Sequence, residues 1–243
     1  ILQNLYDRIL FSSNDVEKLR LNDSIRILID SYVTSDSVFT HRFTHLRYLG
    51  QIKSPDSKLK IINWNVFLRD GNNKYFCYLI RKGEKGKENR VYKLSGSHND
   101  KTIKTNISYS ERDWYGALYY AIQPFKKDYI VLGIDQGSSF LTRKIIDVLS
   151  FAADGGLLFG KNCFIKGSET KSREVLEYSS ESVVSLRFNS SKLIVFDHLE
   201  VYSAGHENNP DSYGAGLSFD GYKLNKGICE FVSNIDAKNI RKK

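Results

Sequence analysis

The sequence predicts an α+β protein, in which an N-terminal helical segment is followed by a predominantly antiparallel β domain made of consecutive hairpins. Apolar residues recur every three to four positions up to about residue 50 and every second position after it. Clusters of Gly, Asn and Asp then separate short apolar runs, as hairpin turns require. The chain also has 15 Tyr, 14 Phe and 2 Trp but only 3 Pro, a composition that favours sheet.

The helical segment is expected over residues 1–50. Its apolar side chains keep a helical spacing up to residue 32, with some slippage. Asn14 or Asp15 can cap the start of a helix. The sequence Ser-Pro-Asp-Ser at residues 54–57 is a turn signal, because proline cannot continue a helix and biases the preceding residue away from the α conformation.

The β domain is expected over residues 51–243. Five turn clusters predict five hairpins, at residues 70–73, 126–128, 154–156, 189–191 and 225–227. The run TRKIIDVLSF at residues 142–151 could also be a helix, but its Ile and Val content and the Asp-Gly-Gly turn after it favour a strand. No repeated signature is visible, so a sandwich-like or barrel-like sheet is favoured, and a partial propeller stays open.

The net charge of +8 comes from 36 Lys and Arg against 28 Asp and Glu. The densest basic stretch, RKGEKGKENRVYK at residues 81–93, is interrupted by Glu84 and Glu88 and does not have the spacing of a phosphate-binding loop. A solvated hairpin loop fits it better. The remaining surplus is scattered, so the sequence predicts no nucleic-acid partner, and weak nucleic-acid binding through basic surface is kept as a second alternative.

The three cysteines, Cys77, Cys163 and Cys229, lie 86 and 66 residues apart, so at most one bridge can form and the sequence leaves their disulfide state open. Burial as small apolar side chains is the favoured interpretation. No apolar run approaches the roughly 18 residues that cross a bilayer, so no transmembrane segment is predicted. The chain has no methionine, position 1 included, which favours a processed, exported product.

No catalytic or metal-binding motif is recognisable. His41 and His45 have a spacing that a helix could use for a metal, but no third ligand follows, so no metal and no cofactor are predicted. The serines of DQGSSF, at residues 135–140, are not in a nucleophile elbow. Asp197 and His198 follow an apolar run and would point to opposite faces of a strand. The sequence therefore predicts no catalytic residues, and leaves enzymatic activity open while favouring its absence.

Aromatic and acidic side chains supply the candidate ligand or interaction surface. Trp114 and Tyr115, flanked by Glu111 and Asp113, could form a sugar-stacking platform or could pack in the core. Aspartates near predicted hairpin ends could cap turns or converge on one ligand. The candidate residues are Trp64, Trp114, Tyr115, Asp135, Asp197, His198 and Asp220.

An ordered series of segments resembles a family of uncharacterised exported proteins of Bacteroidota. The segments include SPD followed by INWN, WYGALYY, TRKIIDVLSF and IVFDHL, and the resemblance covers about residues 52–236. It implies a β-rich fold and an exported location, periplasmic or associated with the outer membrane. It brings no reaction and no catalytic residues.

The expected function is that of an exported envelope protein, most consistent with a non-enzymatic binding or interaction component. An envelope protein or a glycan is the expected partner, and the sequence leaves the oligomeric state open. The main alternative is a hydrolase acting on carbohydrate or peptide. Two convergent carboxylates in a deep pocket, or a serine within hydrogen-bond reach of a histidine, would favour that alternative.

Overall fold

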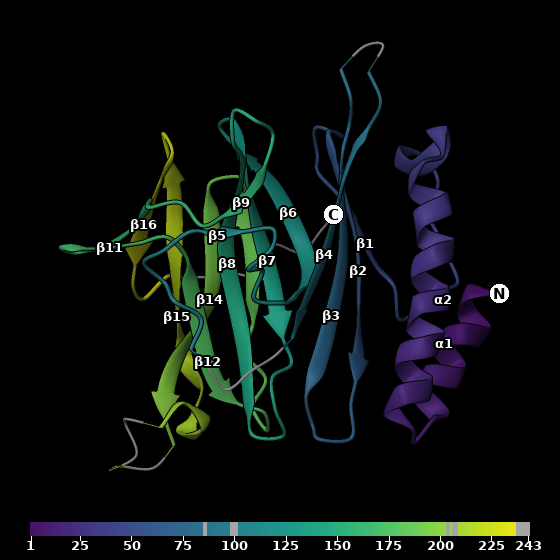
Figure 1. Ribbon diagram of the computed structural model, residues 1–243. Coiled ribbons are helices and arrows are strands. Elements are labelled where there is room, and N and C mark those ends of the chain that lie inside the picture. Colours follow the sequence, from purple (N-terminus) through teal and green to yellow (C-terminus); the bar gives the residue numbers. More distant parts are fainter. Residues whose placement is uncertain (85–86, 98–101, 203–204, 206–208, 237–243) are drawn as a thin grey trace.

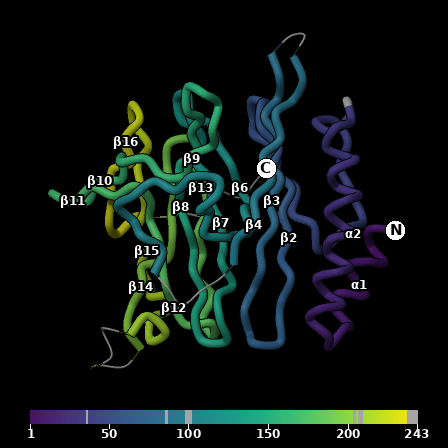
Figure 2. Tube along the Cα trace, viewed as in Figure 1, coloured from purple at the N-terminus to yellow at the C-terminus, as the bar shows by residue number. Residues whose placement is uncertain are grey.

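The structure is a computed structural model that describes residues 1–84, 87–97, 102–202, 205 and 209–236. Within these residues, two N-terminal helices are followed by strands that form three sheets. Figure 1 shows the helical layer and the three sheets in a row, with the helices at one end. The colours of Figure 2 follow the chain from the helices through the first and second sheets to the third. The expected fold class, helices followed by antiparallel hairpins, is confirmed, and the sheets do not close into a barrel.

The helical layer consists of α1 (Leu2–Phe11) and α2 (Asp15–Val33), followed by the short 3-10 helix η1 (Asp36–Phe39). Helix α2 begins where the sequence predicts, because the Asn14 side chain accepts hydrogen bonds from the backbone N–H groups of Val16 and Glu17. Asp15 and Glu17 in the first turn also complement the positive end of the helix dipole.

Residues 40–49 differ from the sequence expectation, since the helical pattern was expected to continue to about residue 50. They form no helix, and the Gln51 side chain instead hydrogen-bonds both the backbone N–H and the C=O of Phe43. The rings of Tyr32, His41 and Phe43 pack against one another here. His41 and His45 are therefore not held at helical spacing.

The first sheet packs against the helices. Its strands, in spatial order, are β1 (Gly50–Lys53), β2 (Leu59–Phe67), β3 (Asn73–Arg81) and β4 (Arg90–Ser97). The basic stretch of residues 81–93 is the hairpin between β3 and β4, as predicted, although Lys85 and Gly86 lie outside the described residues.

The second sheet lies in the middle of the row of sheets. Its strands, in spatial order, are β5 (Tyr109–Ser110), β9 (Leu157–Phe159), β8 (Leu141–Phe151), β7 (Asp128–Asp135) and β6 (Leu118–Phe125). Strand β12 (Glu174–Ser179) pairs with the first half of β8. The run TRKIIDVLSF is thus a strand, as its composition indicates.

The third sheet ends the row. Its strands, in spatial order, are β11 (Glu169–Lys171), β10 (Phe164–Lys166), β16 (Ile228–Val232), β15 (Tyr213–Asn225), β14 (Leu193–Val201) and β13 (Leu186–Ser190). A short 3-10 helix, η2 (Pro210–Ser212), precedes β15. Strands β10 and β16 run parallel, whereas the other neighbouring strands of this sheet run antiparallel.

A separate apolar core fills each space between layers. Strand β2 shows why, because its alternate side chains face opposite layers. Ile62 and Trp64 belong to the core against the helices, whereas Leu59 and Ile61 belong to the core against the second sheet. A third core, which includes Ile146, joins the second sheet to the third. The near-continuous apolar sequence of β2 therefore reflects burial on both faces.

All five predicted hairpins are present, joining β2 to β3, β6 to β7, β8 to β9, β13 to β14 and β15 to β16. Gly71 and Gly155 each have a φ of 83°, in the left-handed region where a side chain would be strained. In the part of the chain that the structure describes, no helix has both the length and the apolar content needed to cross a bilayer.

Candidate functional site

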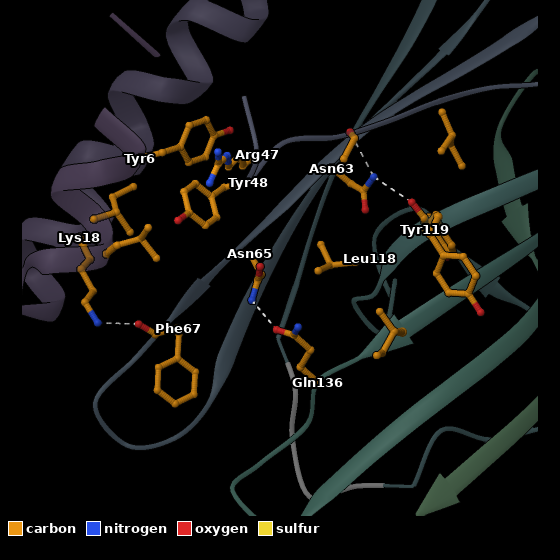
Figure 3. Close-up of a pocket in the computed structure, with 16 residues that line it drawn as sticks. Tyr6, Lys18, Arg47, Tyr48, Asn63, Asn65, Phe67, Leu118, Tyr119 and Gln136 are labelled. Carbon is orange, nitrogen blue, oxygen red and sulfur yellow. Dashed lines mark hydrogen bonds between the residues drawn. The ribbon is translucent and has the colours of Figure 1, made fainter. Parts of the chain in front are cut away.

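A cleft of about 550 Å³ opens where the helical layer, the edge of the first sheet and the second sheet meet (Figure 3). Tyr6, Ile9 and Lys18 line it from the helices. Strands β6 and β7 line the opposite side, with Leu118 and Ile134 among their contributions. Its volume is in the range of pockets that hold a small organic ligand.

The cleft exists because β2 is longer than its edge partner β1. The last residue pair between them is Gly50 with Asn63, so β2 continues beyond this point without a strand on that side. The far end of the free edge is closed by α2, whose Lys18 Nζ donates a 2.7 Å hydrogen bond to the Phe67 carbonyl. The stretch of edge between Asn63 and Phe67 faces the cleft.

Asn63 is the most informative residue of the cleft, because it is only 1% exposed and polar. Its Nδ2 donates to the carbonyl oxygens of Tyr119, at 3.1 Å, and Gly50, at 3.4 Å (Figure 3). These two acceptors fix the orientation of the amide, since the reverse orientation would set oxygen against oxygen. Among the described residues, Asn63 Oδ1 has no hydrogen-bond partner.

Gly50 makes room for this amide. A Cβ atom at position 50 would lie 2.8 Å from Asn63 Nδ2 and 3.2 Å from the Asn63 carbonyl oxygen. Those separations are shorter than ordinary contacts, so a side chain there would displace Asn63. The glycine and the asparagine therefore form one structural unit at the edge of the sheet.

Tyr6 brings a second unpartnered polar atom to the cleft. Its side chain is 3% exposed, and in the described part of the chain its hydroxyl has no hydrogen-bond partner. Burial raises the pKa of Tyr6 above its usual range, so the hydroxyl stays protonated and available as a donor. An unpartnered buried polar group costs about 1–3 kcal/mol, which a ligand with a complementary group recovers.

The charged residues that line the cleft are both cationic. They are Lys18 and Arg47, of which Lys18 is buried and lies 3.9 Å from Asp15, whereas Arg47 is exposed. The described lining contains no Asp, Glu, His, Cys, Ser or Thr. The cleft thus offers apolar walls, hydrogen-bonding groups and positive charge, without a nucleophile paired to a base.

A bridge of amide side chains borders the cleft. Asn65 Nδ2 donates to Gln136 Oε1 at 3.1 Å (Figure 3). It also donates to Asn73 Oδ1 at 2.6 Å. Because Asn65 belongs to the first sheet and Gln136 follows the last residue of β7, this contact spans the two sheets. It links the two walls of the cleft.

The structure places the candidate residue Trp64 in the core between the helices and the first sheet. Its side chain is 1% exposed, stacks on Phe76 and Tyr78, and donates from Nε1 to Asn22 Oδ1 at 2.7 Å. It has no surface to offer a ligand. Its two neighbours in the strand, Asn63 and Asn65, nevertheless line the cleft.

Trp114 and Tyr115 lie in the core between the first two sheets. Trp114 is 4% exposed and donates to the hydroxyl of Tyr119, and Tyr115 donates to the buried carboxylate of Asp147 at 2.8 Å. Both rings thus pack against the core, Trp114 as a buried residue and Tyr115 as a partly buried one, and the covered Trp114 ring leaves no face on which a sugar could stack.

Asp147 forms the centre of a buried ionic network that the sequence did not reveal. Arg173 Nε donates to its Oδ2 at 2.8 Å, and both side chains are fully buried. Burial raises the pKa of Asp147, while the ion pair with Arg173 acts in the opposite direction. Arg173 also donates to the backbone carbonyls of Lys104, Ile107 and Phe159. A network with this many satisfied groups stabilises the fold.

Asp135 has a similar structural role at the end of β7. It is 1% exposed, accepts from the Tyr75 hydroxyl at 2.7 Å and from the Gly137 N–H at 2.9 Å, and pairs with Arg143 at 3.3 Å. These contacts match the turn-capping alternative for the aspartates. Asp135 and the residues that contact it do not line the cleft. Gln136, the next residue in the chain, does line it.

The remaining candidates, Asp197, His198 and Asp220, lie in the third sheet. Asp197 Oδ2 accepts from the Ser185 N–H at 2.7 Å, and His198 Nδ1 lies 2.7 Å from Asp220 Oδ2. A carboxylate thus orients this half-exposed histidine, but it is Asp220 rather than the neighbouring Asp197. In the described residues, no hydroxyl or thiol lies within hydrogen-bond reach of His198, so the pair has no nucleophile.

The sequence missed Asn63 and Tyr6 as site residues. The available signal was an asparagine between the apolar residues Ile62 and Trp64 in a strand with several buried positions, where an amide needs a specific partner. Comparison of the chain with protein-family models, with curated proteins and with solved structures finds no match. The chemistry of the cleft therefore rests on its own residues.

Proposed function

We propose that this protein is a non-enzymatic binding protein that holds an amphipathic small molecule in the cleft beside β2. The observation that carries the proposal is the buried acceptor Asn63 Oδ1, which has no partner among the described residues and belongs to a residue that lines an apolar cleft. A ligand that donates a hydrogen bond to this oxygen removes its desolvation cost. Most buried polar groups in native proteins have a hydrogen-bond partner, and Asn63 is an exception that borders a cleft.

The lining specifies the chemistry of the ligand. Ile9, Leu118 and Ile134 require an apolar body, and Asn63 Oδ1 requires an O–H or N–H group. Arg47 at the exposed side favours an acidic group, because no carboxylate in the described lining competes for it. The expected ligand is therefore an apolar acid that also carries a hydrogen-bond donor.

The hydrolase alternative is less well supported. The cleft has no carboxylate in its described lining, and the His198–Asp220 pair is in the third sheet, away from the cleft-lining residues. Hydrolysis by a general base requires a nucleophile or a positioned water within reach of that base. Ligand binding needs only the apolar walls, the hydrogen-bonding groups and the positive charge that line the cleft, whereas hydrolysis would also need a base and a nucleophile that the described lining does not contain.

An exported location in the cell envelope is the second part of the proposal, and the family resemblance is its support. An envelope component, protein or glycan, is then the expected environment of the ligand. Fractionation of native cells, followed by immunoblotting with an antibody against this chain, tests the location. Signal confined to the cytoplasmic fraction would overturn it without affecting the cleft.

Fluorescence titration with 6-anilinonaphthalene-2-sulfonate tests the binding proposal. This probe has an apolar aromatic body, an N–H donor and a sulfonate, so it carries all three expected features. We expect one probe per chain. Leu118→Trp, which fills the cleft, should weaken binding at least tenfold, whereas Val183→Trp, at an exposed position outside the lining, should leave it unchanged.

A second pair of variants separates charge from shape. Arg47→Gln should weaken binding of the sulfonate by about fivefold, the effect of roughly 1 kcal/mol from an exposed ion pair. It should leave binding of the uncharged probe N-phenyl-1-naphthylamine unchanged. Arg112→Gln, at an exposed arginine outside the lining, is the matched control. Equal binding by Leu118→Trp and the wild-type chain, with both folded by circular dichroism, would refute the proposed site.

A further inference from the structure

Two of the three cysteines lie side by side in the core between the second and third sheets. Cys163 Sγ is 4.0 Å from Cys229 Sγ, and the two residues are 4% and 0% exposed. They are 66 residues apart in the chain. Cys77 belongs to a different core, between the first and second sheets.

The backbone around this pair has the geometry that a disulfide requires. The Cys229 N–H donates to the Cys163 carbonyl oxygen at 2.8 Å, and Cys229 is the register partner of Phe164 in the parallel β10–β16 ladder. With standard backbone dimensions, this hydrogen bond limits the separation of the two Cα atoms to about 6.7 Å. Disulfides span Cα separations of about 4.4–6.8 Å, so side-chain rotation can bring the sulfurs together.

We propose that Cys163 and Cys229 are a disulfide site, which an oxidising environment converts from two thiols to one bridge. The two S–H bonds break, one S–S bond forms, and two protons and two electrons leave the chain. A low-molecular-weight or protein disulfide is the oxidant, and it is reduced to two thiols through a mixed disulfide with one of the two cysteines. The site is independent of the proposed ligand cleft.

The local structure provides access to the sulfurs. The β10–β11 hairpin joins the rest of the third sheet through only two residue pairs, Phe164 with Cys229 and Ile165 with Glu230. Opening of this hairpin also exposes the buried ring of Phe164, but it costs less than unfolding of the whole sheet. The hydrogen bond between the two thiols and burial raise the pKa of Cys229, so exchange is expected during folding or from the opened hairpin.

The bridge would add a covalent link to this edge of the sheet. It would connect the start of β10 to β16, across a loop long enough to restrict the unfolded chain strongly. Cys77 has no such role, because it lies in the central strand β3 of a different core. The three cysteines therefore divide into one adjacent pair and one cysteine in a different core.

Refolding of the full chain in a glutathione buffer, reduced in one arm and oxidised in the other, tests the proposal. Free thiols are then blocked under denaturing conditions, and tryptic peptides are mapped by mass spectrometry without reduction. The oxidised arm should yield peptide 162–166 linked to peptide 227–238, with peptide 75–81 carrying a blocked thiol. The oxidised chain should melt at least about 5 °C above the reduced chain.

Variants provide the control. Cys77→Ala should keep the linked peptides and the difference in melting temperature, whereas Cys163→Ala should lose both. The peptide map of the wild-type chain needs no variant, so it decides the question even where an alanine variant fails to fold. Three blocked thiols in the oxidised arm, or a linked peptide that contains Cys77, would overturn the proposal.

Discussion

Replacement of Asp147 by asparagine tests the buried ion pair in the second sheet. Asp147 Oδ2 accepts from Arg173 Nε and from the Tyr115 hydroxyl, both at 2.8 Å, and its Oδ1 accepts from the Val148 N–H at 2.7 Å. An asparagine offers one oxygen to these three donors and turns an NH₂ group toward the others. It also leaves the fully buried guanidinium of Arg173 without a counter-charge.

Removal of one partner from a buried ion pair typically costs about 3–5 kcal/mol. We expect Asp147→Asn to lower the free energy of unfolding by that amount, which is a large part of the 5–15 kcal/mol that is typical of folded proteins. Urea denaturation followed by circular dichroism and tryptophan fluorescence measures it. Glu111→Gln, at an exposed acid, should change stability by less than about 0.5 kcal/mol.

A double-mutant cycle with Arg173→Met shows whether the two charges act together. We expect a coupling energy of about 2 kcal/mol, because the second substitution removes the charge that the first one left unpaired. Additive effects of the two substitutions, or a loss of less than about 1 kcal/mol in Asp147→Asn, would refute the idea that this ion pair stabilises the core.

Three further results are expected. Burial lowers the pKa of Lys60 to about 8, so between pH 8 and 10 the unfolded chain binds more protons than the folded chain. The free energy of unfolding, measured by urea denaturation, should therefore rise by about 1 kcal/mol from pH 7 to 9, relative to the Lys60→Met variant. Asn14→Ala should cost about 1 kcal/mol in the same assay, whereas Asn14→Asp keeps the cap. Gly96→Ala should cost about 1–3 kcal/mol in urea, because its Cβ would lie 2.7 Å from the Gly116 backbone; an unchanged midpoint would contradict that close contact.

The local elements of this protein were predictable from sequence. Turn residues at the five hairpins determine where the chain reverses, and their effect depends on backbone conformation within a few residues. The start of α2 was predictable for the same reason, because Asn14 caps the helix through the backbone N–H groups of Val16 and Glu17, two and three residues further along the chain. The helix end was not, since residues 40–49 are held by Gln51 and by aromatic packing instead of by helical hydrogen bonds.

The candidate surface was less predictable, because exposure depends on what packs against a residue. Trp64, Trp114 and Tyr115 have the residue types of a binding surface, but the layers that cover them come from other parts of the chain. His198 was judged against its sequence neighbour Asp197, whereas its carboxylate partner, Asp220, lies on the next strand. Cross-strand partners are set by register, which turn signals constrain only near the turn.

By itself, the sequence determined the order of helices and strands and the positions of the turns, because these follow from periodicity and local conformation. Only the tertiary structure decided that β1 ends at Gly50 opposite Asn63, that the helices close the far end of the exposed edge, and that Cys163 meets Cys229. Those features depend on relative strand lengths and on contacts between distant segments. That Asn63 Oδ1 has no hydrogen-bond partner among the described residues can be recognised only from the positions of all the groups around it.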